Sequence, residues 1–147
     1  MDERIVQFIS RNKLMVLGTC VNNKPHTATL FYCFIEDENV LLFMSKKTTQ
    51  HAVECSQNKF VSCCINESKK RLLSSKSAQI NGECFEVDEN EFDNYYKKYT
   101  SRHPIALLFK NTTLYKVQCK EIKFTDNSLG FATKIIWEER NKNEFAY

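Results

Sequence analysis

The chain has 147 residues, of which 42% are hydrophobic and 27% charged, with only 3 Gly and 2 Pro. This composition excludes collagen-like, linker-like and low-complexity chains, and it is typical of a folded domain that buries its own core. The formal net charge of +3 is too close to balance to indicate nucleic acid or an anionic membrane as the main partner. We therefore expect one domain over residues 1–147, with a polar, frayed tail at 138–147.

The ends and the cysteines indicate the compartment. No apolar run approaches the ~20 residues of a membrane-spanning helix, and the first residues lack the pattern of a signal peptide, so we expect no membrane partner and a cytoplasmic location. The 7 cysteines form an odd set without any Cys-x-x-Cys pair, and no two histidines stand at helical spacing. We therefore expect reduced thiols and no metal site.

The first part of the chain predicts a helix followed by a sheet. Ile5, Phe8 and Ile9 share one face of an amphipathic helix over residues 3–11. Three β-like runs then predict an antiparallel meander with both faces covered, which suits a small closed barrel. These runs span residues 14–21, 27–35 and 40–45.

The rest of the chain alternates strands with short helices. Asp88 and Glu91 form a capping-box pattern that begins the clearest helix, and we interpret its stripe of Tyr95, Tyr96 and Tyr99 as packing. Gly82 inside a strand indicates a bulge or a close approach of two backbones. Together the runs predict a mainly antiparallel α+β domain built around a barrel. The predicted elements are a helix at 48–58, a strand at 60–65, a loop or splayed hairpin at 66–77, a strand at 78–87, a short helix at 105–109, and strands at 114–124 and 131–137.

The best local candidate for a binding site is the junction from Ser45 to His51, where a strand ends and a helix begins. Helix-initial N–H groups are unpaired and the helix dipole is positive there, while Ser45, Lys46 and Thr49 add further donors. Such a junction suits a phosphate monoester, but the same residues are equally those of a solvated basic turn capped by threonine, and the two interpretations stay open. The chain carries none of the common catalytic motifs, and no residue plainly acts as an acid or a base.

Several segments resemble one known family. Residues 43–45 (Phe-Met-Ser), 49–51 (Thr-Gln-His) and 58–62 (Asn-Lys-Phe-Val-Ser) are similar, with matching spacing, to the flavin-phosphate segment of the pyridoxamine-5′-phosphate-oxidase-like split barrels. Residues 79–83, Tyr95 and residues 103–106 continue the resemblance. The run at 121–131 and the pair Ile136-Trp137 resemble a small bacterial branch of that superfamily, so the likeness covers about residues 3–137.

The resemblance implies a six-stranded antiparallel split β-barrel with short flanking helices, which pairs into a homodimer with two FMN sites at the interface. It implies an oxidoreductase that passes hydride or electrons from a reduced nicotinamide donor to a small-molecule substrate. Its implied cofactor-binding residues fall in three groups. Thr27, Ala28, Thr29 and Leu30 flank the flavin ring; Ser45, Lys46, Thr49, Gln50 and His51 hold the phosphate; and Trp137 comes from the other subunit.

The chain also departs from the family pattern. Gln50 stands where the family has a phosphate-clamping Arg, and a neutral amide lacks the charged fork of a guanidinium. Tyr99 stands where the pyridoxamine oxidases have an Arg for the substrate phosphate, so we do not expect vitamin B6 oxidation. The alternatives are a non-catalytic binding module for flavin, haem or another planar ligand, and a plain dimeric interaction protein. His51 is either a ligand contact or a surface helical residue, and Trp137 either stacks on the flavin or packs in a core or interface.

Overall fold

The computed structural model describes residues 1–67, 74–128 and 133–140. The middle of the predicted 66–77 loop, the start of the strand predicted at 131 and most of the tail at 138–147 lie outside these ranges. No helix among the described residues is long and apolar enough to cross a bilayer.

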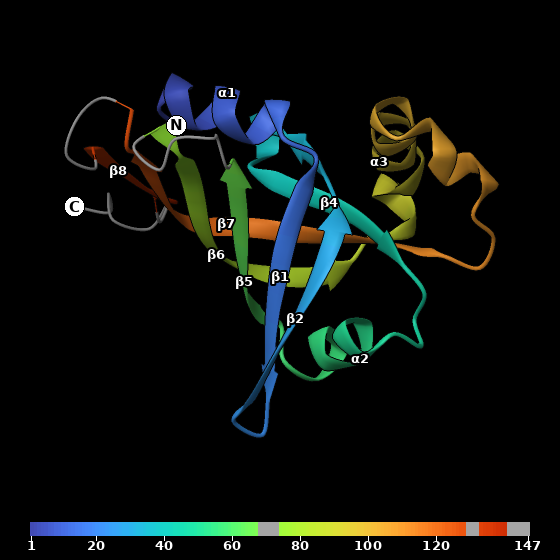
Figure 1. Ribbon diagram of the computed structural model, residues 1–147. Coiled ribbons are helices and arrows are strands. Elements are labelled where there is room, and N and C mark those ends of the chain that lie inside the picture. The colour runs from blue at the N-terminus through green and yellow to red at the C-terminus, as the bar shows by residue number, and fades with distance from the viewer. Residues whose placement is uncertain (68–73, 129–132, 141–147) are drawn as a thin grey trace, which may run out of the picture.

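Short helices flank a single sheet (Figure 1). In the first helix Ile5, Phe8 and Ile9 are buried as predicted, and the Asp2 carboxylate accepts a hydrogen bond from the Arg4 amide at 2.9 Å, which caps its first turn. The helical elements are α1 (Glu3–Arg11), η1 (Glu36–Glu38), α2 (Gln50–Gln57), α3 (Glu89–Arg102) and η3 (Pro104–Leu108), where η marks a 3₁₀ turn.

Eight described strands form one sheet in which all pairings are antiparallel, in the order β2-β1-β5-β6-β7-β4-β3, with β8 paired to the far part of β7. The sheet curls into a half-barrel (Figure 1), which confirms the predicted fold class although the strand number differs from six. The strands are β1 (Leu14–Val21), β2 (Lys24–Phe31), β3 (Cys33–Ile35), β4 (Val40–Ser45), β5 (Phe60–Glu67), β6 (Lys76–Glu86), β7 (Thr113–Asp126) and β8 (Thr133–Glu138).

The strand predicted over residues 27–35 is interrupted at Tyr32. The buried Tyr32 hydroxyl donates to the carbonyl of Ile9 at 2.6 Å, and its amide donates to the carbonyl of Lys13 at 2.9 Å, so the residue is tied to the end of α1. Its own carbonyl lies 2.7 Å from the ring nitrogen Nε2 of His103. Because the chain leaves the ladder here, β2 pairs with β1 while β3 pairs with β4, and the predicted continuous meander is wrong.

This interruption opens the barrel. β2 is one edge strand of the sheet, and β4 lies next to the opposite edge, between β7 and β3. Among the described residues no ladder joins β2 to β4, yet β2 contacts both β4 and α2. One backbone edge of β2 therefore faces β4 and the start of α2 without a strand partner.

Asp88 is the N-cap of α3 as predicted, but the capping box is wrong, because the Asp88 side chain makes no capping hydrogen bond and the Glu91 carboxylate accepts from Lys116. The predictions for Gly82 and for the aromatic stripe agree with the fold. The register of β6 and β7 shifts between Asn81 and Gly82, which confirms the bulge, and a Cβ at Gly82 would lie 2.5 Å from the Gln118 carbonyl oxygen. Tyr95 and Tyr99 are buried in a cluster between α3 and the sheet, so the aromatic stripe packs. The main core lies between the concave face of the sheet, α1 and α2.

Candidate functional site

Three predicted residues meet where β4 ends and α2 begins. Ser45 is the last residue of β4, Thr49 is the N-cap of α2, and His51 lies in its first turn. The Ser45 hydroxyl is 2.7 Å from His51 Nε2 and 3.0 Å from the Thr49 hydroxyl, which is itself 3.2 Å from His51 Nε2. We call these three residues the β4–α2 cluster.

The N-cap of α2 leaves the helix start open. The Thr49 hydroxyl donates backward to the carbonyl of Lys46 at 2.9 Å, and among the described residues it makes no hydrogen bond to an amide of the first turn. Amides of that turn therefore keep donor capacity at the positive end of the helix dipole. This geometry suits an anion.

His51 is buried, which makes the surface-residue alternative wrong. Burial lowers its pKa, the nearby His26 lowers it further, and the charge of Glu54 acts in the opposite direction. The imidazole is therefore neutral at pH 7, with one ring nitrogen protonated. Such a group exchanges hydrogen bonds with Ser45 without placing a charge in the core.

The other two predicted phosphate ligands, Lys46 and Gln50, are exposed. Gln50 is exposed, and its amide donates to the Glu54 carboxylate at 2.9 Å, one turn along the helix. Lys46 is exposed beside the turn, whereas the neighbouring Lys47 pairs with Glu86 at 2.8 Å.

A second polar cluster, which the sequence does not indicate, joins β1, β2 and α2. The Thr19 hydroxyl of β1 donates to Glu54 of α2, and the same carboxylate lies 3.3 Å from Nδ1 of His26 in β2. The hydrogen bonds from Thr19 and then Gln50 lower the pKa of Glu54. His26 and Glu54 line a cleft of about 450 Å³ beside the helix start. Their separation in sequence gives no signal of this contact.

The residues predicted to flank a ring lie on β2 but on both of its faces. Ala28 and Leu30 point inward, with Leu30 packed against the core, whereas Thr27 and Thr29 point outward. A ring cannot contact all four side chains on one face. It can instead lie along the unpaired backbone edge of β2, where consecutive N–H and C=O groups are within reach.

Trp137 is not part of this arrangement within one chain. It lies on β8, pairs with Ile122 of β7 and packs against the main core. β8 and α2 occupy opposite ends of the sheet (Figure 1). Within one chain the Trp137 side chain is therefore partly buried against the core.

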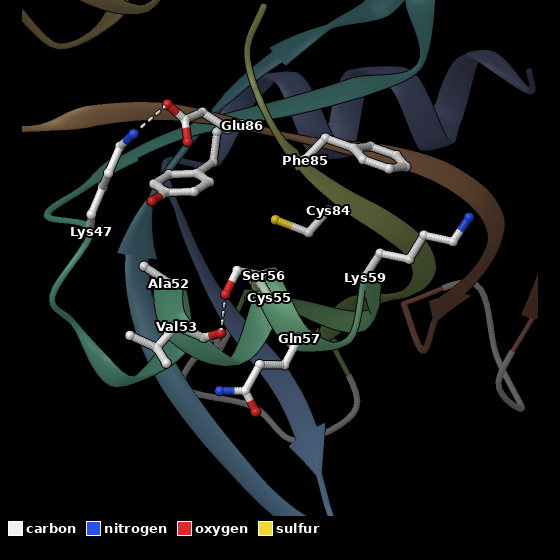
Figure 2. Close-up of a pocket in the computed structure, with 11 residues that line it drawn as sticks. Lys47, Ala52, Val53, Cys55, Ser56, Gln57, Lys59, Cys84, Phe85 and Glu86 are labelled. Atoms are coloured by element: carbon white, nitrogen blue, oxygen red, sulfur yellow. Dashed lines mark hydrogen bonds and ion pairs between the residues drawn. The ribbon is translucent and has the colours of Figure 1, made fainter.

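A larger cleft lies on the other side of α2. It has a volume of about 570 Å³ and separates the helix from Cys84, Phe85 and Glu86 of β6 (Figure 2). Lys47 and Lys59 lie at its rim and Cys55 at its floor. Among the described residues there is no group of three or more His, Cys, Asp or Glu side chains that would hold a metal ion.

Comparison with known proteins gives a consistent result. A family model described as Pyridoxamine 5'-phosphate oxidase matches residues 1–126. The UPF0306 protein plu4501 of Photorhabdus laumondii is 28% identical over 134 residues, which cover 91% of this chain and 93% of that protein.

Solved structures share the fold at low identity. A heme binding protein from Mycobacterium smegmatis superposes with a TM-score of 0.74 at 10% identity, over 87% of this chain and 54% of that one. A FAD-binding protein from Mesorhizobium loti superposes with a TM-score of 0.71 at 12% identity, over 83% and 92% of the two chains. At such identities the likeness concerns the fold alone.

Proposed function

Because the chain belongs to the pyridoxamine 5′-phosphate oxidase family, we propose that it binds flavin mononucleotide in the opening between β2, the end of β4 and the start of α2. The observation that carries this proposal is the β4–α2 cluster, whose N-cap hydroxyl is turned away from the helix amides. A phosphate at this point receives first-turn N–H groups and the hydroxyl of Ser45, while the Thr49 hydroxyl stays on the carbonyl of Lys46. Lys46 supplies the positive charge.

The isoalloxazine ring fits the edge of β2 in this proposal. The small residues Thr27, Ala28 and Thr29 allow a flat ring to approach the backbone closely. Unpaired backbone N–H and C=O groups along the edge match the donors and acceptors of a flavin ring. Leu30 belongs to this strand as well, and its side chain closes the inner side against the core.

The site is proposed to be shared between two copies of the chain. Apolar side chains lie exposed on the outer face of the sheet, namely Leu14 and Val16 on β1 and Phe60 on β5. Two shallow clefts of about 550 and 490 Å³ lie on that face, and Thr27 lines both. A partner that covers this face buries apolar surface and brings its own Trp137 toward the ring.

When bound, the flavin supplies hydride and electron transfer, and the chain's own groups hold and orient it. His51 stays neutral and keeps its proton within the β4–α2 cluster, so it contributes hydrogen bonds without charge. The Glu54 carboxylate lies 3.3 Å from Nδ1 of His26, and the two side chains line the cleft beside the start of α2. We therefore assign oxidoreductase chemistry with a nicotinamide donor and a small substrate.

That substrate is not pyridoxamine phosphate in this proposal. The two positions matched to the phosphate-binding Tyr and Arg of the oxidases hold Tyr95 and Tyr99, and both serve the packing of α3. The Tyr95 hydroxyl donates to Glu38, and the Tyr99 hydroxyl donates to the carbonyl of Phe31 at 3.3 Å. A side chain engaged in this way does not grip a second phosphate.

A non-catalytic planar-ligand binder is the second candidate. Gln50 occupies the position of the phosphate-clamping Arg and is bound to Glu54, which weakens the case for a tightly held phosphate. The structural relative from Mycobacterium smegmatis is named a heme binding protein. Haem therefore is the alternative ligand for the same opening.

The test is the visible spectrum of the purified protein with added FMN or haemin, followed by NADH or NADPH. Flavin bands that shift on binding and bleach with the nicotinamide support the oxidoreductase. Bound flavin that does not bleach favours storage or sensing, and a haem spectrum without flavin binding supports the second candidate. If neither ligand changes the spectrum, both proposals fail.

A further inference from the structure

Large apolar side chains are exposed in and just after η3. Ile105, Leu107 and Leu108 belong to this turn, Phe109 follows it, and their exposed fractions lie between 56% and 74%. Phe31, at the end of β2, is 55% exposed, and its ring centroid lies 5.6 Å from that of His103, the residue before the turn. Single exposed apolar residues are common, whereas a group of large ones marks a contact surface. We call this group the η3 patch, which consists of Phe31, Ile105, Leu107, Leu108 and Phe109.

The turn that carries the patch is held to the rest of the molecule. His103 is buried, and its Nε2 lies 2.7 Å from the carbonyl oxygen of Tyr32. Ala106 is buried between α3 and the sheet, and its amide donates to the carbonyl of His103 at 3.0 Å. The amide of Phe109 in turn donates to the carbonyl of Ala106 at 3.1 Å. The small alanine therefore faces the core while its larger neighbours face outward, although a turn that only covered a core would bury the larger side chains.

The η3 patch lies on an outer surface of the molecule. None of the clefts described above is lined by a residue of the patch. α3 and the turn that follows it lie at the end of the molecule opposite β8 (Figure 1). A small molecule needs a concave site that encloses most of its surface. The patch therefore suits a broad surface rather than a small ligand.

The sequence around the patch is basic. Residues 94–113 contain no Asp or Glu, and their cations are Lys97, Lys98, Arg102 and Lys110. Lys97 and Lys110 are exposed, and neither belongs to an ion pair among the residues that the structure describes. Lys98 lies 3.9 Å from Glu38, and Arg102 donates to the carbonyl of Ser10 at 2.8 Å. The net charge of +3, which argued against an anionic membrane, averages over this local excess of positive charge.

We propose that the η3 patch docks the protein on an anionic lipid surface. The apolar side chains enter the boundary between headgroups and acyl chains, while Lys97 and Lys110 stay at the level of the anionic headgroups. The strength of such binding grows with the buried apolar area and with the attraction between cations and anionic lipids. Lysine is depleted in interfaces between proteins, whereas lysine beside exposed leucine and phenylalanine is typical of an interfacial lipid anchor. This peripheral binding needs neither a membrane-spanning helix nor a flavin, so its test is independent of the proposed function.

The first experiment mixes the purified wild-type protein with vesicles of phosphatidylcholine alone, or of phosphatidylcholine with phosphatidylglycerol, and sediments the vesicles. We expect the protein to sediment with the anionic vesicles and to stay in solution with the neutral ones. Added salt is expected to release it, because salt screens the attraction between lysines and headgroups. Protein that stays in solution with both kinds of vesicle, as a protein-docking surface would, overturns the proposal. Equal binding to both kinds, or binding that salt does not weaken, also overturns it.

The variants Ile105→Glu and Ile136→Glu form a matched pair. The two isoleucines are 59% and 62% exposed and receive the same change of charge, but Ile136 lies on β8, far from the patch. We expect Ile105→Glu to lower the partition coefficient onto anionic vesicles at least tenfold and Ile136→Glu to leave it unchanged. Lys110→Ala is expected to lower it about fivefold, since one cation near the surface contributes about 1 kcal/mol.

The proposal falls if Ile105→Glu partitions like the wild type, or if Ile136→Glu loses binding to the same extent. Light scattering without lipid tests the other occupant, a second copy of the chain. If Ile105→Glu lowers the oligomeric state, the patch is an interface between copies and the lipid proposal is wrong. The comparison of neutral and anionic vesicles uses the wild type, so it gives an answer even if a variant does not fold.

Discussion

The side chains at the start of α2 divide into those that hold the protein together and those that remain free for a ligand. His51 is buried and bonded to Ser45, whereas Gln50 is exposed and bonded to Glu54. The contact of Gln50 is on the surface, so it contributes little to stability. A change at Gln50 therefore tests ligand binding, and a change at His51 tests the fold.

We expect Gln50→Arg to tighten FMN binding by about 1 kcal/mol, or about fivefold in Kd, because a guanidinium pairs with a phosphate in a charged, bidentate manner. Isothermal titration with FMN measures the change. The control Gln57→Arg places the same charge at the other end of α2 and is expected to leave Kd unchanged. Equal affinity of Gln50→Arg and the wild type would remove residue 50 from the phosphate site.

His51 gives a pH dependence of stability. Burial lowers its folded-state pKa below the unfolded value of about 6.5, so the unfolded chain binds the extra proton first. The contribution of neutral His51 to the free energy of unfolding is then fully present above about pH 7. It is lost progressively as the pH drops through 6.5 toward the lowered pKa.

The variant His51→Gln is expected to flatten this slope between about pH 7 and 5, as measured by urea unfolding at several pH values. At pH 8 the imidazole of the wild type is neutral in both the folded and the unfolded state. The difference in unfolding free energy between the wild type and His51→Gln at this pH therefore measures only the lost hydrogen bond and packing. A slope equal to that of the wild type contradicts the assignment of a neutral, buried His51.

At the scale of elements, Gly18 of β1 and Gly82 of β6 both lie inside the sheet but have different neighbours. A Cβ at Gly82 would lie 2.5 Å from the backbone oxygen of Gln118 at the bulge of β6. A Cβ at Gly18 would lie 2.6 Å from the Ser62 hydroxyl, which is the end of a side chain that can rotate. The Gln118 backbone cannot move away from Gly82 without breaking hydrogen bonds between β6 and β7.

We therefore expect Gly82→Ala to lower the free energy of unfolding by about 2–3 kcal/mol and Gly18→Ala by about 1 kcal/mol or less. Urea denaturation of both variants measures the difference. Equal losses would mean that the bulge does not constrain Gly82 more than the flat pairing constrains Gly18.

At the scale of the molecule, the outer face of the sheet is the proposed interface between the two copies of the chain. Phe60 on this face is 62% exposed, and Leu108 on η3 is 74% exposed. Both are apolar, but Phe60 lines a cleft beside Thr27. The proposed homodimer covers Phe60 and leaves Leu108 in solvent.

We expect Phe60→Glu to convert the dimer to a monomer and to weaken FMN binding at least tenfold, because the site is shared. Light scattering after size-exclusion chromatography and the FMN titration measure the two effects. Leu108→Glu is the control and is expected to keep both properties. A monomeric wild type, or a monomer formed by Leu108→Glu alone, would contradict the proposed interface.

Local sequence determined the elements and part of the site. The helix at 3–11 and the strands at 14–21 and 40–45 have the predicted bounds, since apolar periodicity and turn residues act within a few positions. The meeting of Ser45, Thr49 and His51 also follows from their closeness along the chain.

Contacts between residues that are far apart in the sequence were decided by the tertiary structure alone. The anchoring of Tyr32 to α1 ends β2 and opens the barrel. The pairing of His26 with Glu54 depends on how α2 packs beside strands far away in sequence. Such contacts arise from the closure of the whole sheet, which fixes long-range geometry only when all strands have found their partners.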